Sequence, residues 1–102
     1  MKVKIKENSL IAKMAAWYMG SKNIAIVFGK TIHLHGVNKN EFMAVEQWVN
    51  HELVHVRQFQ RYGFITFLAI YAIESMRKGY YNNRFEVEAR IGETTGEKIT
   101  IH

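Results

Sequence analysis

The 102-residue chain contains no cysteine and no aspartate, and these two absences narrow its chemistry. Without cysteine it has no disulfide, no thiolate ligand for a metal ion and no cysteine nucleophile. All nine acidic residues are glutamates, so any carboxylate ligand or carboxylate base must be a glutamate. Histidine and glutamate are therefore the only strong metal ligands that the sequence offers.

Proline is also absent, and no repeat, low-complexity tract or proline-rich linker divides the chain. With 48% hydrophobic residues, a chain of this length suits one small domain with a single core and little stability to spare. We expect residues 1–102 to form one α+β domain, to whose stability a bound metal ion would add.

The formal net charge of +5 arises in the first part of the chain. Residues 1–40 contain seven lysines and one acidic residue, whereas residues 41–102 contain seven basic and eight acidic residues. A basic segment can bind nucleic acid, an anionic membrane or an acidic substrate. Because the lysines at 2–6 alternate with apolar residues, as on a half-solvated strand, and none cluster on a recognition helix, we expect no nucleic-acid binding.

We expect neither a signal peptide nor a membrane-spanning segment in this sequence. The N-terminus is charged, and the apolar stretch after Ser9 is interrupted by Lys13. Residues 64–73 are apolar nearly throughout but too few to cross a bilayer. We expect them to form a helix in the core of a cytoplasmic protein, with a helix on a membrane surface or against a partner as the alternative.

Hydrophobic periodicity and turn residues predict several helices with a small β-sheet. Asn8 or Ser9 can cap the first helix, and Gly20 can end it. His33 and His35 alternate with apolar residues, and we expect them on the solvated face of a strand. The expected elements are a strand at 2–6, a helix at 10–19, a β-hairpin at about 23–35, helices at about 41–62, 64–77 and 84–92, and an edge strand or a disordered tail from 93.

The most informative stretch is His51-Glu52-Leu53-Val54-His55 on the expected helix at 41–62. Residues four apart lie one turn apart on the same helix face, so His51 and His55 can direct two imidazoles at one metal ion. Glu52 can reach a water molecule on that ion without being a ligand, which is the arrangement of a metal-assisted hydrolase. The pattern predicts a catalytic zinc site with Glu52 as the general base.

A zinc ion held by two histidines needs a third protein ligand. Gln58 and Arg61 occupy the positions at which a metzincin has a glycine and a third histidine, and an aspartate ligand is impossible. A glutamate from the helix at 84–92 remains, and that helix contains Glu86 and Glu88. Their side chains point about 200° apart, so only one of them can face the histidines.

The segment His51–His55, a gap of about thirty residues and the sequence Phe85-Glu-Val-Glu-Ala89 resemble the gluzincin metallopeptidases. The resemblance covers about residues 23–92 and is closest to the minimal members called minigluzincins and to the catalytic cores of CAAX-protease-like proteins. It implies a zincin-like fold and zinc-dependent cleavage of peptides. It also implies that Glu86, three residues before the alanine, is the third zinc ligand.

The resemblance carries two further implications. Residues Thr31–Leu34 would form the edge strand above the cleft, where an extended peptide binds by strand addition. Many gluzincins have an aspartate four residues after the ligand glutamate, but this chain has Arg90 there. Either another group, such as a backbone carbonyl or Glu46, orients His51, or the site is weaker than usual. The candidate donors to the oxyanion are Tyr80, Tyr81, His33 and Arg57.

We therefore expect a zinc metallopeptidase that acts on peptides or proteins. Glu52 would take a proton from water and pass it to the leaving amine. The alternative is a metal-stabilised domain that binds a peptide or partner without turnover, since no specificity pocket is evident in the sequence.

Overall fold

The computed structural model describes residues 3–95. Within them, one three-stranded sheet has the order β1-β3-β2. The strands β2 (Ile24–Phe28) and β3 (Thr31–His35) form the expected antiparallel hairpin, and β1 (Lys4–Lys6) pairs with β3 in parallel. The strand or disordered tail expected from residue 93 is wrong for residues 93–95, which continue the last helix, and the rest of that tail lies outside the described residues.

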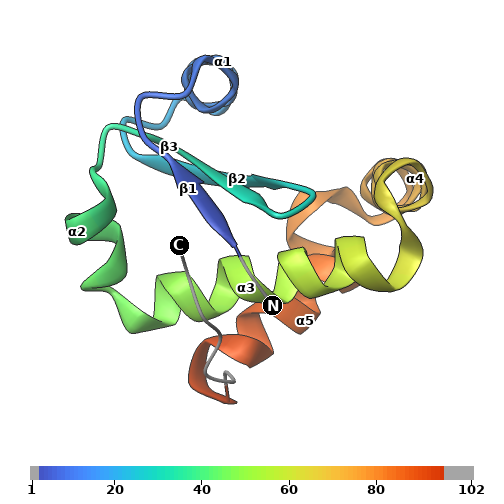
Figure 1. The fold of residues 1–102 in the computed structure, drawn as a ribbon. Helices are drawn as coiled ribbons and strands as arrows, with labels where there is room; N and C mark the ends of the chain where they lie inside the picture. The colour runs from blue at the N-terminus through green and yellow to red at the C-terminus, as the bar shows by residue number, and fades with distance from the viewer. Residues whose placement is uncertain (1–2, 96–102) are drawn as a thin grey trace.

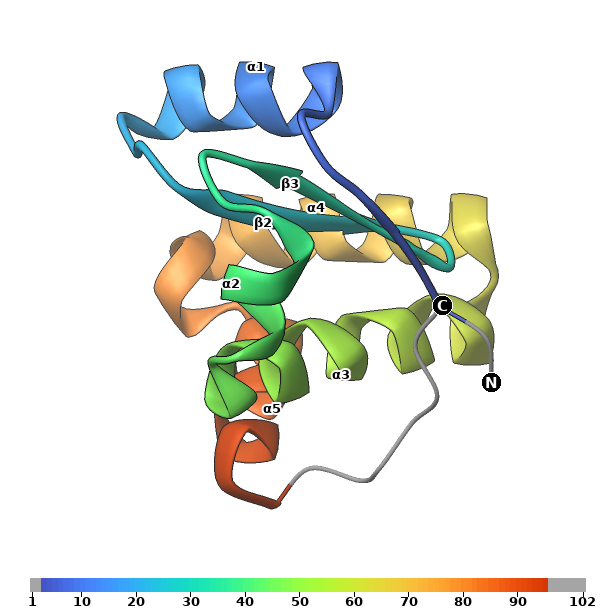
Figure 2. The same ribbon diagram turned by 60° about the vertical axis from the view of Figure 1, so that its left-hand side comes forward.

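Helices cover the sheet on both faces, as expected for an α+β domain (Figures 1 and 2). Helix α1 lies on one face and α3 on the other, α5 packs against α3 on the side away from the sheet, and α4 runs beside the sheet and α3. No helix in the described part of the chain is long and apolar enough to cross a membrane. The helices are α1 (Leu10–Met19), α2 (Lys39–Met43), α3 (Glu46–Tyr62), α4 (Phe64–Asn82) and α5 (Arg84–Thr95).

The strand order corrects one expectation about the sheet. Residues Thr31–Leu34 belong to the central strand, because β1 occupies the side of β3 that the hairpin leaves open. Strand β2 is an edge strand of the described sheet, and its residues line the cleft described below. Sequence alternation shows which residues share a strand face, but it does not reveal the order of strands in a sheet.

The expectation that His33 lies on a solvated strand face is also wrong, because helix α1 covers that face. Its side chain is buried, and its Nδ1 lies 2.8 Å from Oγ of Ser9, the residue that caps α1. Burial, and secondarily the charge of Lys6, lowers the pKa of His33. Helix α1 packs on this part of the sheet and shields it from water.

The helix expected at 41–62 is two helices, because the chain turns at Ala44 and Val45. Asn38 and Glu41 form a capping box at the start of α2. In a continuous helix, Phe42 and Trp48 would point about 120° apart. The break allows their rings to meet edge to face with centroids 5.1 Å apart, and Phe42 is fully buried.

Helix α4 is not the buried core helix that its composition suggests. Phe67 is its one buried residue and packs on Phe59 and Phe85, whereas Ile65 is 74% exposed and Ile73 is 55% exposed. The helix lies at the side of the sheet, so only one of its faces meets the core. Its regular geometry ends near the expected residue 77, at Gly79, whose φ of 79° favours glycine.

Gly92 allows α5 to approach α3 closely. A Cβ atom at position 92 would lie 2.4 Å from Cγ2 of Val54, far inside van der Waals contact. Valine in a helix has essentially one rotamer, so its methyl group cannot turn away freely. The absence of a side chain at Gly92 therefore sets the spacing between the two helices that supply the candidate site.

We predict that Gly92→Ala lowers the free energy of unfolding by about 1–3 kcal/mol, the usual cost of overpacking. In the background of Val54→Ala, which removes the obstructing methyl groups, the same substitution should be neutral or stabilising, because alanine is the better helix former. Urea unfolding of the four proteins in this double-mutant cycle measures both effects. An equal loss in the two backgrounds would show that the contact with Val54 does not set the helix spacing.

Candidate metal centre

Helix α3 carries His51 and His55 on one face, and α5 presents a carboxylate to both. Nε2 of His51 lies 3.1 Å from Oε1 of Glu86, and Nε2 of His55 lies 3.1 Å from its Oε2. One ligand atom from each of the three residues lies within 4.8 Å of the others. The three residues predicted as metal ligands are therefore together in the structure.

Asn83 fixes the start of α5 and thereby the position of Glu86. It is fully buried, and its Oδ1 accepts a hydrogen bond from the backbone of Phe85 at 2.9 Å. Its Nδ2 donates to the backbone oxygen of Tyr71 and to Oγ of Ser75. One amide thus caps α5 and attaches it to α4.

The other ring nitrogens of both histidines are also held. Nδ1 of His51 donates to Oε2 of Glu93 at 2.9 Å, and Nδ1 of His55 donates to Oε1 of Gln58 at 2.9 Å. The amide oxygen of Gln58 faces the imidazole because its Nε2 donates to Phe85 O and to Glu88 Oε1. These contacts keep a proton on each Nδ1, so a metal ion would replace the proton on each Nε2.

Glu93 and Gln58 were missed as orienting groups in the sequence. Helical spacing could have predicted both, because Glu93 lies seven residues after Glu86, on the same side of its helix, and Gln58 lies three residues after His55. Arg90, at the position of the usual aspartate, donates instead to the backbone oxygen of Tyr81 and stacks on its ring. The alternatives of a backbone carbonyl or Glu46 are therefore wrong for His51, because Glu93 occupies that role.

The close contacts change the acidity of each group. Burial raises the pKa of Glu86, but hydrogen bonds from His51 and His55 outweigh burial and hold it well below its usual range. Burial lowers the pKa of His51, but the hydrogen bond to Glu86 and the charge of Glu52 raise it to about 9. Burial raises the pKa of Glu52 to about 7 against the opposing charges of the histidines.

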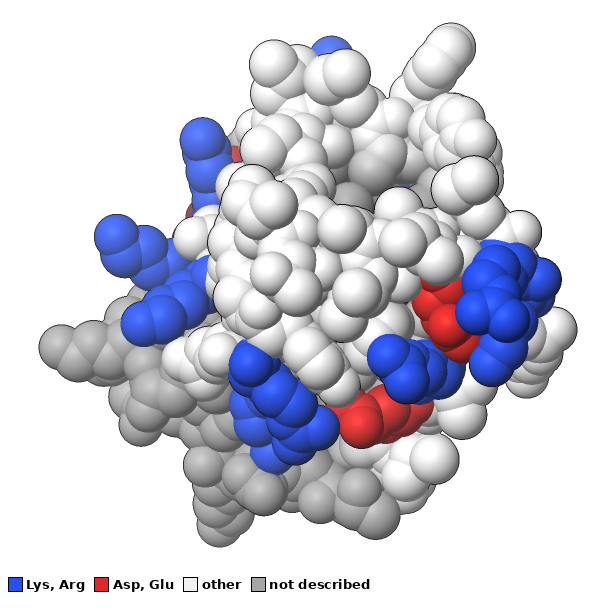
Figure 3. Space-filling model, turned by 90° about the vertical axis from the view of Figure 1, so that its right-hand side faces the viewer, with Lys and Arg blue, Asp and Glu red and all other residues white. Residues whose placement is uncertain are grey.

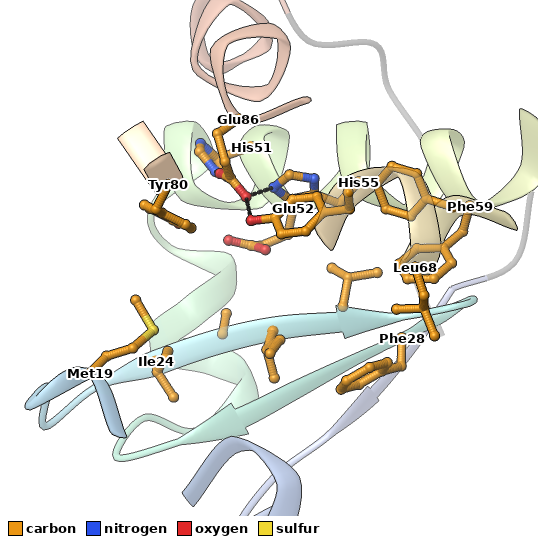
Figure 4. Close-up of a pocket in the computed structure, with 15 residues that line it drawn as sticks. Met19, Ile24, Phe28, His51, Glu52, His55, Phe59, Leu68, Tyr80 and Glu86 are labelled. Carbon is orange, nitrogen blue, oxygen red and sulfur yellow. Dashed lines mark hydrogen bonds and ion pairs between the residues drawn. The ribbon is translucent and has the colours of Figure 1, made fainter. Parts of the chain in front are cut away.

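A cleft of about 230 Å³ separates the two histidines from strand β2. Figure 4 shows Glu52 and Glu86 at this cleft, Tyr80 at one end and Phe28 with Leu68 toward the other. Burial and the charges of Glu86 and Glu52 raise the pKa of Tyr80, which therefore stays protonated as a donor. Of the four candidate oxyanion donors, Tyr80 lines the described cleft, and Tyr81, His33 and Arg57 do not.

The donor set fits zinc. Two imidazoles and one carboxylate form a known type of catalytic zinc site, which keeps a further position for water or substrate. Tyr71 supports the set by donating from its hydroxyl to Oε2 of Glu86. Glu88 is directed elsewhere, since its carboxylate accepts from Gln58. Glu86 is thus the glutamate of this pair that the structure brings to the histidines.

We predict that the protein binds one zinc ion and that Glu86→Gln weakens binding more than about a hundredfold. The matched variant Glu88→Gln should change zinc affinity little, because Glu88 contacts Gln58 and not the histidines. Competition titration against a chelating dye gives the affinities, and zinc should raise the melting temperature of the wild type by mass action. The opposite order of the two variants would exclude Glu86 as the ligand.

We also predict that Glu93→Ala weakens zinc binding by about tenfold to a hundredfold, the usual effect of losing a group that orients a ligand histidine. Glu93→Gln keeps an oxygen that can accept from Nδ1 of His51 and should weaken binding less. The same titration ranks the two variants. Equal affinities for wild type and Glu93→Ala would mean that this contact does not orient His51.

Comparisons with protein-family models, with curated proteins and with solved structures found no match to this chain. The candidate metal centre therefore rests on its own residues and their geometry.

Proposed function

We propose that the protein is a zinc-dependent metallopeptidase of gluzincin type. The observation that carries the proposal is the meeting of His51, His55 and Glu86 in one group, with their Nδ1 partners in place and Glu52 at the same cleft. Structural zinc sites are closed by four protein ligands, whereas a set of three protein ligands beside a cleft is typical of catalysis. A zinc ion held by these three residues would act as a Lewis acid, which lowers the pKa of bound water and polarises a peptide carbonyl.

Glu52 is the residue that we assign to proton transfer. It follows the first histidine, lines the cleft and has a pKa raised by burial to about 7. A carboxylate of that basicity can accept the proton of an attacking water at neutral pH and then donate it to the amine that leaves. Glu52 is thus assigned to proton transfer, whereas Glu86, whose carboxylate contacts the two histidines, is assigned to metal binding.

Tyr80 is the donor that we assign to the developing oxyanion. It lines the cleft beside His51 and Glu52, and its hydroxyl stays protonated there. Tyr80 directly follows the break in helical geometry at Gly79, and Figure 4 shows it beside the cleft. A hydroxyl at this place could donate a hydrogen bond to charge that appears only during the reaction.

The substrate that suits this cleft is an extended polypeptide. Ile24 and Ala25 of β2 line the cleft together with His51 and Glu52. As an edge strand, β2 has backbone groups that can pair with a peptide by strand addition. Apolar side chains from Phe28, Phe59 and Leu68 line one end of the cleft and favour an apolar substrate side chain there.

The test of this function is Glu52→Gln, measured against an unstructured protein substrate such as casein. The amide has nearly the shape of the carboxylate but cannot accept a proton, so activity should fall by about a hundredfold or more. Zinc affinity and the melting temperature of the zinc-loaded protein should stay near those of the wild type. Activity should also disappear with a chelator and return with added zinc.

A wild type that binds zinc but cleaves nothing across a broad peptide library would contradict the proposal. If Glu52→Gln then bound peptides as the wild type does, the protein would be a metal-stabilised binding domain. Tyr80→Phe is a useful companion variant, because it removes the proposed donor and keeps the ring. It should lower turnover with little effect on zinc affinity.

A further inference from the structure

The outward face of α4 carries no charged residue over about three turns. Helices on the surface of a globular protein normally place charged side chains toward water. Here Ile65 and Ile73 are 74% and 55% exposed. The exposed residues of this stretch are Phe64, Ile65, Thr66, Ala69, Ala72 and Ile73.

Helix α1 is a second helix with an apolar outer side. It buries only Ala12 and Ala16 and exposes Leu10, Met14, Trp17 and Tyr18, with Lys13 as its single charged residue. Met19 at its end and Leu68 of α4 line the same cleft, so the two apolar helices flank it. Tryptophan and tyrosine are side chains that favour the boundary between lipid and water.

Positively charged residues flank this stretch of α4 at both ends. Arg61 lies just before the helix, and Arg77 and Lys78 lie near its end, all exposed. Glu74 is largely covered and pairs with Lys78 at 3.0 Å. Figure 3 shows a broad surface free of charged residues, with Lys and Arg along its borders and the visible acidic groups beside them.

We propose that this face binds the surface of an anionic lipid bilayer. Helix α4 would lie along the membrane with Ile65 and Ile73 at the boundary between headgroups and acyl chains, while Arg61 and Arg77 contact lipid phosphates. An uncharged face with a positive border complements an anionic bilayer. A second copy of the chain would oppose a border of the same sign, which disfavours pairing through this face.

Binding to a membrane does not require peptidase activity, but it would define the substrates of a peptidase. The inner side of α4 contributes Leu68 and Tyr71 to the cleft. Docking through the outer side would bring the cleft close to the bilayer surface. Resting on the proposed function, the substrate class would then be polypeptide segments at that surface.

The experiment is cosedimentation of the full zinc-loaded chain with vesicles of phosphatidylcholine containing phosphatidylserine. The wild type should bind these vesicles and bind pure phosphatidylcholine much less. Ile65→Ser/Ile73→Ser should lower the partition coefficient by about tenfold or more, because two exposed apolar side chains are lost. The matched variant Met43→Ser/Val45→Ser, which changes exposed apolar residues at the end of α2, should bind as the wild type does.

A second pair of variants tests the charged border. Arg61→Gln/Arg77→Gln should lower binding to the anionic vesicles by roughly tenfold or more. Lys4→Gln/Lys39→Gln removes the same charge from β1 and α2 and should have a smaller effect. Glu52→Gln should bind like the wild type, so this experiment gives the same answer whether or not the protein is a peptidase.

Three results would overturn the proposal. The first is failure of the folded protein to bind anionic vesicles. The second is an equal loss of binding in the α4 variant and its α2 control. The third is a stable dimer in sedimentation that Ile65→Ser/Ile73→Ser converts to a monomer, since the face would then be covered by a second copy.

Discussion

A buried carboxylate shared by two histidines is the interaction on which the rest of this structure depends. Glu86 is 3% exposed, and an ionised carboxylate at such a position is tolerated only with partners. Two imidazoles and the Tyr71 hydroxyl supply them. In a metal-free protein, protons on the histidines balance this charge, and metal binding would release those protons. The fold therefore holds charged groups together at a place where a cation fits.

Three residues around the site hold the helices and side chains of this arrangement in place. Asn83 fixes the first turn of α5, Gly92 lets the same helix approach α3, and Gln58 connects His55 with the backbone at Phe85. Within the described residues, every fully buried side-chain nitrogen and oxygen has a hydrogen-bond partner. A satisfied polar network of this kind holds ligand side chains in one geometry, which is what affinity and selectivity for a metal require.

Local signals in the sequence predicted much of this fold. The helix at 10–19 and the hairpin were confirmed, because capping residues, glycines and hydrophobic periodicity act within a few residues of the chain. The grouping of His51, His55 and Glu86 was also confirmed. The roles of these residues as metal ligands, the zinc ion, the activity and the family resemblance stay predictions.

The sequence-based predictions were wrong where contacts between distant segments of the chain determine strand order or burial. The position of β3 at the centre of the sheet depends on pairing with β1, and the burial of His33 depends on α1. The exposure of α4 shows a different difficulty, because an apolar composition does not reveal what covers a helix. Glu93 was missed because the expected partner of His51 was sought four residues after Glu86, whereas the partner lies one helical turn further on.

We propose that His51, His55 and Glu86 hold a zinc ion. Anomalous X-ray diffraction at the zinc absorption edge from crystals of the zinc-loaded protein tests it most directly. We expect one strong peak, about 2.0–2.2 Å from Nε2 of both histidines and from a carboxylate oxygen of Glu86. A peak elsewhere, such as at His33 and His35, or no peak in a protein crystallised with zinc, would show that these three residues do not hold the ion.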